Sequence, residues 1–246
     1  MSLALVLFFV AVTEPDVPEA IAVGDSAFAR IDYAAASLAY EQALVDHPRE
    51  PELLWRLSRV YVCRGEVADG EMRQTLLRQA EKAARQCVAM DSLKSQGHTW
   101  LAGALGYLAL EEDLSRKIAL THELKKEALR AIELDPDNDA AYSILGSFYR
   151  ALGNASWFQK TVASVFFGSV PEGGYEEAER ALKKAVDLAP DVMRHEYELG
   201  VLYLDMGKKA EARAALEKAA GLPIRTAIDR PRLERIKGLL SDISER

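Results

Sequence analysis

The side chains best suited to acid–base or metal chemistry in this sequence are four histidines, and they lie far apart. They are His47, His98, His122 and His195. None has a second ligand at metal-binding spacing on its own predicted helix, and His47 stands at a predicted helix end, where a surface imidazole is common. The sequence contains no G-x-S-x-G, P-loop or G-x-G-x-x-G motif. We therefore expect no catalytic residues, no metal site and no cofactor, and a protein that is not an enzyme.

Two acidic stretches and two cysteines are the remaining candidates for chemistry. The acidic stretches, residues 111–113 and 175–180, lie at predicted helix starts, where carboxylates interact favourably with the helix dipole. Cys63 and Cys87 lie inside helical patterns and are not spaced as a pair of metal ligands. We expect solvated helix ends and buried, inert thiols rather than a reactive site.

The composition favours helices and disfavours two classes of partner. Of the 246 residues, 49% are hydrophobic and 28% are charged, which is ordinary for a folded protein. Alanine and leucine are abundant while runs of β-branched residues are scarce, so helix is favoured over sheet. The net charge of −7 disfavours nucleic acid, and also an acidic filament, as the main partner.

Residues 1–15, MSLALVLFFVAVTEP, contain a single apolar run from Leu3 to Val12. This run is too short to span a bilayer as a helix but fits the hydrophobic region of a secretory signal. A basic residue before the run and a lipobox cysteine after it are both missing, and a buried terminal helix is the alternative. We expect a signal-like or anchor segment, and hence an exported or membrane-associated protein, periplasmic if the source is bacterial; a cytoplasmic location is the alternative.

An internal repeat organises the rest of the chain. In the clearest unit, residues 194–223, Gly200 lets two helices approach closely, Tyr203 and Leu216 fill the groove between them, and Pro223 stops the second helix. This pattern resembles the tetratricopeptide repeat, a 34-residue helix–turn–helix. A generic bundle rich in alanine and leucine would also show apolar residues every three to four positions, but it would not repeat glycine, tyrosine, alanine and proline together.

The chain contains five such units in all, some with insertions between their two helices. The predicted units are residues 20–48, 51–92, 96–136, 139–190 and 193–223, followed by a capping helix at about 228–244. The sequence therefore predicts one all-α domain, residues 16–246. We expect a right-handed superhelix of about five tetratricopeptide hairpins with inserted helices and a C-terminal capping helix.

The insertion pattern carries a more specific resemblance. The stretch GHTW near position 100 is followed, in the fourth unit, by a helix containing Leu145 and Gly146, then by Trp157, Pro171 and an EA-rich helix. Over roughly residues 50–220 this arrangement resembles the regulator of microtubule dynamics family. The resemblance implies non-enzymatic binding by proteins that attach to membranes and act at microtubules or organelle contacts. The acidic charge and the signal-like segment fit an exported bacterial relative better than a microtubule-binding protein.

The first helix of each hairpin should line the concave face of the stack, so a second stripe on these helices predicts a binding groove. The predicted groove residues are Asp25, Phe28, Trp55, Arg59, Trp100, Tyr107, Ser143, Ser147, Arg150, Arg194 and Tyr197. Aromatic groups beside arginines suit an extended peptide with acidic or C-terminal carboxylate character, or an anionic lipid headgroup. The alternative is that these aromatic side chains pack in the core.

The insert in the fourth unit has an apolar face of its own. Phe158, Val162, Val165 and Phe166 recur at helical spacing next to Trp157. We expect this helix to fold back on the stack; a lid over an apolar or lipid-bearing groove is the alternative. The sequence as a whole predicts a binding scaffold that holds a protein or peptide segment in the concave groove, with a lipid or acyl-chain binder as the second hypothesis.

Overall fold

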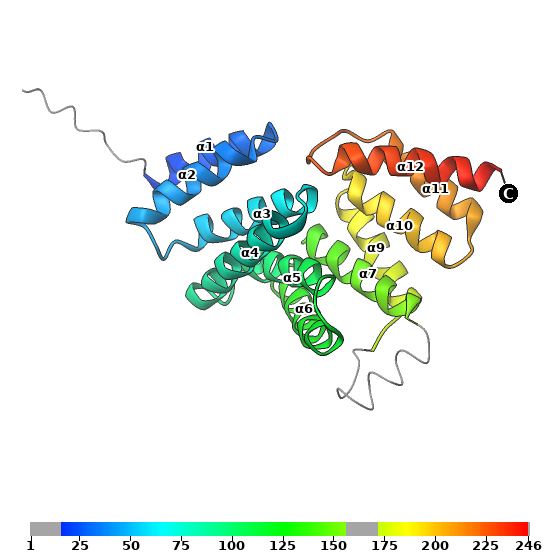
Figure 1. The fold of residues 1–246 in the computed structure, drawn as a ribbon, viewed down its shortest axis with the longest axis horizontal. Helices are drawn as coiled ribbons and strands as arrows, with labels where there is room; N and C mark the ends of the chain where they lie inside the picture. Colours follow the sequence, from blue (N-terminus) through cyan, green and yellow to red (C-terminus); the bar gives the residue numbers. More distant parts are fainter. Residues whose placement is uncertain (1–15, 156–171, 246) are drawn as a thin grey trace, which may run out of the picture.

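The computed structural model describes residues 16–155 and 172–245, and every element of regular structure in these ranges is a helix. Figure 1 shows successive helix pairs that stack side by side along a curved path. The pairs are α1 (Val17–Ala29) with α2 (Tyr33–Asp46), α3 (Pro51–Val67) with α4 (Gly70–Met90), α5 (Ser95–Ala109) with α6 (Leu114–Leu134), α7 (Asp139–Asn154) with α9 (Tyr175–Leu188), and α10 (Met193–Asp205) with α11 (Lys209–Ala220). A single helix, α12 (Asp229–Ser244), follows the fifth pair. The predicted fold class, a superhelix of helical hairpins with a terminal capping helix, is confirmed.

Side-chain caps fix where several helices begin. Asp32, Asp113 and Asn138 each accept a hydrogen bond, at 3.0 Å, from the backbone N–H three residues further along the chain. Pro51 occupies the first turn of α3, where a backbone N–H has no intrahelical partner to lose. Each hairpin is thus delimited by local sequence before any tertiary packing is considered.

Glycine allows the two helices of a hairpin to touch. A Cβ atom on Gly200 would lie 2.7 Å from Cγ of Leu216, and a Cβ atom on Gly146 would lie 2.6 Å from Cγ of Leu182. Both leucines are fully buried. Any larger residue would push the helices apart, which confirms the predicted reason for a small residue at these positions.

The extra residues of the second and third hairpins lengthen helices. Helices α4 and α6 each contain 21 residues, whereas α11 in the fifth hairpin contains 12. The added turns join the core, because Leu76 and Leu77 of α4 and Leu120 of α6 are buried. The insert of the fourth hairpin, with Trp157, Phe158, Val162, Val165 and Phe166, falls in residues 156–171 and lies outside the described residues.

The curvature of the stack follows from which helices touch. The first helix of each hairpin contacts the first helix of the next, from α1 through α3, α5 and α7 to α10. Among the described residues, the backbones of successive second helices stay further apart, and α4 reaches α6 through the ion pair of Arg85 with Glu123 at 2.6 Å. The first helices therefore lie on the inner, concave side of the superhelix.

Helix α12 covers the end of the stack. Ile236 of α12 is fully buried and clusters with Leu216, Ala219 and Met193 of the fifth hairpin. Without α12 these apolar groups would face water, so the helix serves as the cap that such a stack needs.

The segment that leads into α12 also reaches the first hairpin. The backbone N–H of Ala227 donates a hydrogen bond to the hydroxyl of Tyr33 at 3.1 Å, and Ala227 packs against the apolar cluster that contains Tyr33 and Phe28. In Figure 1 this segment, in orange, spans the open side of the curve towards the blue helices. We call the contact between Tyr33 and Ala227 the end clasp, because it joins the two ends of the stack.

The described residues include no helix that is both long and apolar enough to cross a membrane. The apolar run Leu3–Val12, on which the predicted signal or anchor depends, lies outside the described residues.

Candidate functional site

Two hollows lie on the inner side of the stack. The first, which we call the central cavity, has a volume of about 310 Å³ and is lined by Phe28, Arg59, Cys63, Glu66, Trp100, Asp139, Ala140, Ser143, Ile144, Val192, Met193, Arg194, His195, Arg225, Thr226, Ile228, Asp229 and Arg232. The second, which we call the side groove, has a volume of about 430 Å³ and is lined by Gly103, Gly106, Tyr107, Ala109, Leu110, Lys117, Thr121, Leu124, Ile144, Ser147, Phe148, Arg150, Ala151, Arg194 and Glu198. Both volumes lie in the range of small-ligand pockets.

All of the predicted groove residues lie on first helices, but the structure divides them between the two hollows. The residues that line the central cavity are Phe28, Arg59, Trp100 and Ser143. Those that line the side groove are Tyr107, Ser147 and Arg150. Arg194 lines both hollows. Asp25, Trp55 and Tyr197 are absent from the described lining of either hollow. The predicted single groove is therefore two adjoining spaces.

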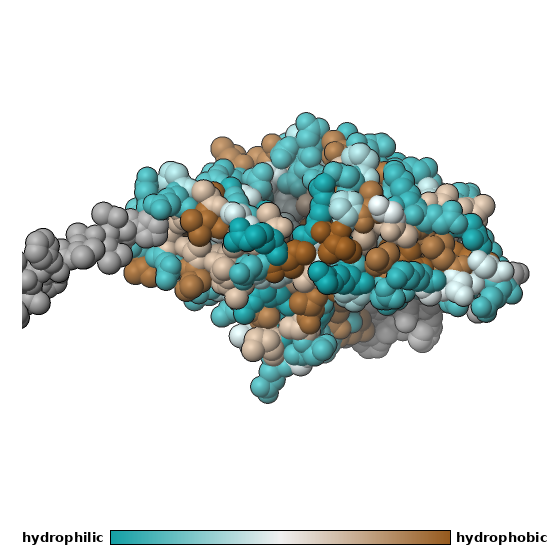
Figure 2. Space-filling model, turned by 90° about the horizontal axis from the view of Figure 1, so that it is seen from above, coloured by the Kyte–Doolittle hydropathy of each residue, from teal (hydrophilic) through white to brown (hydrophobic). Residues whose placement is uncertain are grey.

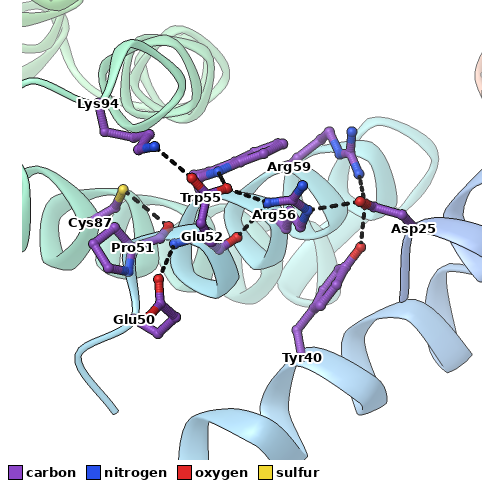
Figure 3. Close-up of polar contacts among 10 residues, drawn as sticks. All are labelled: Asp25, Tyr40, Glu50, Pro51, Glu52, Trp55, Arg56, Arg59, Cys87 and Lys94. Atoms are coloured by element: carbon purple, nitrogen blue, oxygen red, sulfur yellow. Dashed lines mark hydrogen bonds and ion pairs between the residues drawn. The ribbon is translucent and has the colours of Figure 1, made fainter. Parts of the chain in front are cut away.

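Asp25 of α1 holds the first two hairpins together. Its carboxylate accepts hydrogen bonds from Arg56 and Arg59 of α3, each at 2.9 Å, and from the Tyr40 hydroxyl at 2.8 Å (Figure 3). Burial alone would raise the pKa of Asp25, but these hydrogen bonds and positive charges lower it. The Arg59 guanidinium also lies over the Phe28 ring, 3.8 Å from its centre. One arginine expected to meet a ligand thus already has intramolecular partners.

Glu52 continues this network along α3 towards the third hairpin. Its carboxylate accepts hydrogen bonds from Lys94 at 2.5 Å, from Arg56 at 2.6 Å and from the Trp55 indole N–H at 2.9 Å (Figure 3). Although burial opposes ionisation, these contacts lower the pKa of Glu52 to about 2. Trp55 is accordingly held on α3 by Glu52, and the guanidinium of Arg56 lies 4.2 Å from the centre of its ring.

A bridge centred on Glu66 lies between the two hollows. The Tyr107 hydroxyl donates a hydrogen bond to the Glu66 carboxylate, and the Arg194 guanidinium lies 3.5 Å from the same oxygen. Burial would lower the pKa of Arg194, but Tyr107 and Glu66 raise it, so the arginine stays charged. Glu66 lines the central cavity, Tyr107 lines the side groove and Arg194 lines both, which places this bridge at their boundary.

Arg150 and Tyr197 also have partners within the stack. Arg150 forms ion pairs with Asp205 at 3.0 Å and with Glu198 at 3.4 Å. The Tyr197 ring faces the guanidinium of Arg232 from α12 at 5.5 Å. These contacts tie the fourth hairpin to the fifth and the fifth hairpin to the capping helix.

Several lining residues escaped the sequence analysis. Glu66 lies seven positions after Arg59, two helical turns along the same stripe, so extending the stripe by two turns would have found it. His195 was seen only as an isolated histidine. Arg225 and Arg232 had no signal, because only the closure of the stack brings residues 225–232 over the inner face.

The buried histidines and cysteines are held by their surroundings. His98 Nδ1 lies 2.5 Å from the Glu127 carboxylate, which raises the pKa of His98, and His195 Nε2 lies 2.7 Å from the Asp139 carboxylate. Cys63 and Cys87 are free and buried, as predicted, and burial raises the pKa of each thiol to about 12. Within the described residues, no three His, Cys, Asp or Glu side chains are grouped to hold a metal ion.

The two acidic stretches lie at helix starts, where their carboxylates have structural partners. Asp113 caps α6, and Glu111 forms an ion pair with Arg73 of α4 at 2.7 Å. Glu177 accepts a hydrogen bond from the backbone N–H of Gly174 at the start of α9, at 3.0 Å. These contacts account for the acidic stretches without assigning them chemistry.

The comparison with known proteins decides the family. Residues 23–244 match the family described as Regulator of microtubule dynamics protein 1-3. The chain belongs to this family. The predicted resemblance is thereby confirmed.

Curated members of the family are similar over most of this chain. Regulator of microtubule dynamics protein 1 of Mus musculus is 29% identical over 182 residues, which cover 73% of this chain and 60% of the relative. Regulator of microtubule dynamics protein 3 of Xenopus laevis is 28% identical over 196 residues, which cover 79% of this chain and 42% of the relative. The chain thus spans about half the length of the curated relatives that it matches.

A solved structure supports the fold independently. A thermophilic TPR protein of Thermus thermophilus superposes with a TM-score of 0.68 at 23% sequence identity, covering 91% of this chain and 98% of that one. At 23% identity this likeness shows the fold alone, which is an all-helical stack of tetratricopeptide hairpins.

The face of the molecule seen in Figure 2 carries apolar and polar residues side by side. The large apolar side chains that are exposed outside the two hollows, such as Val45, Met72 and Leu129, come from different hairpins. Scattered exposed apolar residues are normal for a folded protein. The two hollows of the inner side are therefore the better candidates for binding.

Proposed function

We propose that this protein is a non-enzymatic binding scaffold that holds a segment of a partner protein in the side groove. The observation that carries the proposal is the composition of this groove. Its floor is apolar, with Leu110, Leu124 and Phe148 among its lining, while Lys117 and Arg150 stand beside it. An apolar floor with cationic groups suits a segment that combines apolar and acidic side chains, or one that ends in a carboxylate.

Local charge supports the same partner chemistry. Among the described residues, three cations line the groove, Lys117, Arg150 and Arg194, against one carboxylate, that of Glu198. Arg150 already pairs with Asp205 and Glu198, and Arg194 pairs with Glu66, so Lys117 is the lining cation that forms no ion pair within the described structure. An acidic group of a bound segment would pair with Lys117.

Site-specific photo-crosslinking in the source cell tests the proposal. A benzoylphenylalanine in place of Ala151, which is exposed and lines the groove, should capture a partner protein. The matched control is the same substitution at Ala214, an alanine of α11 outside the groove. Peptides from the captured protein should then bind the purified chain.

Charge reversal at the groove completes the test. Lys117→Glu should weaken peptide binding by at least about fivefold, whereas Lys184→Glu, at an exposed position of α9, should leave it unchanged. Equal capture from positions 151 and 214, or equal binding by both lysine variants, would remove the side groove from this role.

The lipid-binding alternative depends on Phe158 and Phe166, which lie outside the described residues. No described contact favours it over a protein segment, and it stays a prediction. Native mass spectrometry of the purified protein tests it, because a lid over an acyl chain should retain a lipid mass.

Microtubule binding is a further proposal that the family name raises, and the net charge of −7 disfavours it. We expect no co-sedimentation of this chain with microtubules at physiological salt.

An exported or membrane-associated location rests on residues 1–15, and sequencing the N-terminus of protein isolated from the source cell tests it. The single domain of residues 16–246 also stays a proposal.

A further inference from the structure

More buried polar atoms without a hydrogen-bond partner belong to the described lining of the central cavity than to that of the side groove. Five buried side-chain polar atoms lack a hydrogen-bond partner within the described structure: Arg59 Nε, Ser143 Oγ, Arg150 Nε, Arg194 Nε and His195 Nδ1. Four of these five belong to residues that line the central cavity. Because buried polar groups in folded proteins are nearly always hydrogen-bonded, such a concentration points to a ligand.

The burial of two of these side chains makes the observation specific. Ser143 is 1% exposed and His195 is 2% exposed. The neighbouring Ser147, one turn further along α7, donates its hydroxyl hydrogen bond to the Ser143 carbonyl at 3.0 Å and is satisfied. Ser143 therefore differs from its neighbour in leaving its own hydroxyl available inside the cavity.

The unpartnered polar atoms of the cavity are mainly donors. The Nε–H groups of Arg59 and Arg194 can only donate, and the Ser143 hydroxyl can also donate. His195 Nδ1 accepts a hydrogen bond when the ring is neutral with its proton on Nε2, and donates one when the ring is protonated. A ligand that meets two guanidinium N–H groups and a hydroxyl must present acceptor oxygens, and a carboxylate does so with matching charge.

The walls and the volume restrict the rest of the ligand. Phe28, Trp100, Ile144, Met193 and Ile228 contribute apolar surface around the donors. A volume of about 310 Å³ is at the lower end for small-molecule pockets, so the ligand is small. The cavity draws lining residues from all five hairpins and from the segment before α12, and the end clasp closes one of its sides.

From these features we propose that the central cavity binds a small organic carboxylate with an apolar body. The carboxylate meets the Nε–H groups of Arg59 and Arg194 and the Ser143 hydroxyl, and the apolar body lies against Phe28 and Trp100. This ligand is distinct from the protein segment proposed for the side groove, and the two sites meet at the Glu66 bridge.

Titration of the full chain with phenylacetate and hexanoate, by calorimetry and ligand-observed NMR, tests this inference. Each carboxylate should bind saturably with one molecule per chain, and phenylacetamide and hexanamide should bind at least about tenfold more weakly, because the amide lacks the charge. Failure of both carboxylates to bind saturably at millimolar concentrations would overturn the proposal, as would equal binding of acid and amide.

Two serines on one face of α7 supply matched variants. Ser143→Val removes the cavity hydroxyl and should weaken carboxylate binding by at least about tenfold, whereas Ser147→Val makes the same change in the side groove and should leave it unchanged. The reverse pattern would place the ligand in the side groove and overturn the assignment. Thr226→Phe fills the cavity from the segment before α12 and repeats the test if Ser143→Val does not fold. Crosslinking from position 151 does not depend on any of these variants, so the two proposals fail separately.

Discussion

Glycines on the first helices illustrate how single residues set the packing. Gly200 is required because a Cβ atom there would lie 2.7 Å from Leu216, whereas a Cβ atom on Gly103 would meet Ile144 at an ordinary 3.5 Å. Gly200→Ala should therefore lower the free energy of unfolding by about 1–3 kcal/mol through overpacking. Gly103→Ala should raise it by about 0.5–1 kcal/mol, because alanine is the better helix former.

Chemical denaturation of both variants measures the two effects. The pair controls for the change itself, since both replace a helical glycine by alanine on a first helix. Equal effects of the same sign would show that helix propensity, and not the approach of α10 to α11, decides stability at these sites.

His98 gives the stability a pH dependence. Hydrogen bonding to Glu127 raises the pKa of His98 above the ordinary value of 6.5. The charged ring therefore contributes stability that is fully present below pH 6.5 and is lost as the pH rises through the raised pKa. Thermal unfolding between about pH 6 and 9 should show a falling midpoint in the wild type and a flatter curve in His98→Gln. Parallel curves would contradict this role for the pair.

At the residue scale, the sequence showed which residues lie on the inner face but did not show what they contact. The stripe rule placed Arg59 and Trp55 on the same first helix, α3, because it depends only on helical periodicity. It could not show that Asp25 and Glu52 already bind these side chains and link them to other hairpins. The division of the stripe into two hollows likewise depends on Glu66, whose bridge spans sequence positions 66 to 194.

Among the elements, α12 has the clearest structural role, because it covers the apolar end of the stack. Its Ile236 side chain is fully buried and packs on the fifth hairpin. Ile236→Ala should lower the free energy of unfolding by about 2–4 kcal/mol. Glu234→Ala, at an exposed position of the same helix, should change it by less than about 0.5 kcal/mol. Urea denaturation followed by circular dichroism measures both, and a small effect of Ile236→Ala would mean that α12 is not the cap.

The helices themselves were largely predictable, since caps and apolar periodicity are local. Asp32, Asn138 and Pro51 mark helix starts in the sequence as they do in the structure. The structure that the inserted residues adopt could not be predicted from local sequence in the same way. Whether they form a loop, a separate helix or extra turns depends on whether groups such as Leu76 and Leu120 find a partner in the stack.

For the whole molecule, the end clasp joins the first hairpin to the segment before α12. Tyr33→Phe removes the hydroxyl that accepts the Ala227 N–H and should let the first hairpin move away from the segment before α12. Spin labels on Ala29→Cys and Arg230→Cys, both at exposed positions, report the separation. The native thiols of Cys63 and Cys87 do not compete for label, because burial raises their pKa to about 12.

The expected result is a distance distribution that broadens towards longer values in Tyr33→Phe. Tyr142→Phe, outside the clasp, serves as the control and should retain the wild-type distribution. If Tyr33→Phe leaves the distribution unchanged, apolar packing of Ala227 alone holds the ends together.

The clasp also changes how the stability of one repeat unit depends on that of the others. In an open array of repeats, stability is a sum of each unit and its neighbours, and the outermost units fray first. Here the first unit has neighbours on both sides, because its Tyr33 meets the segment that follows the last unit. The array is coupled like a ring, so loosening α12 should speed amide exchange in α1 and α2, almost the whole length of the chain away. A protein built from consecutive modules thereby unfolds more nearly as one cooperative body.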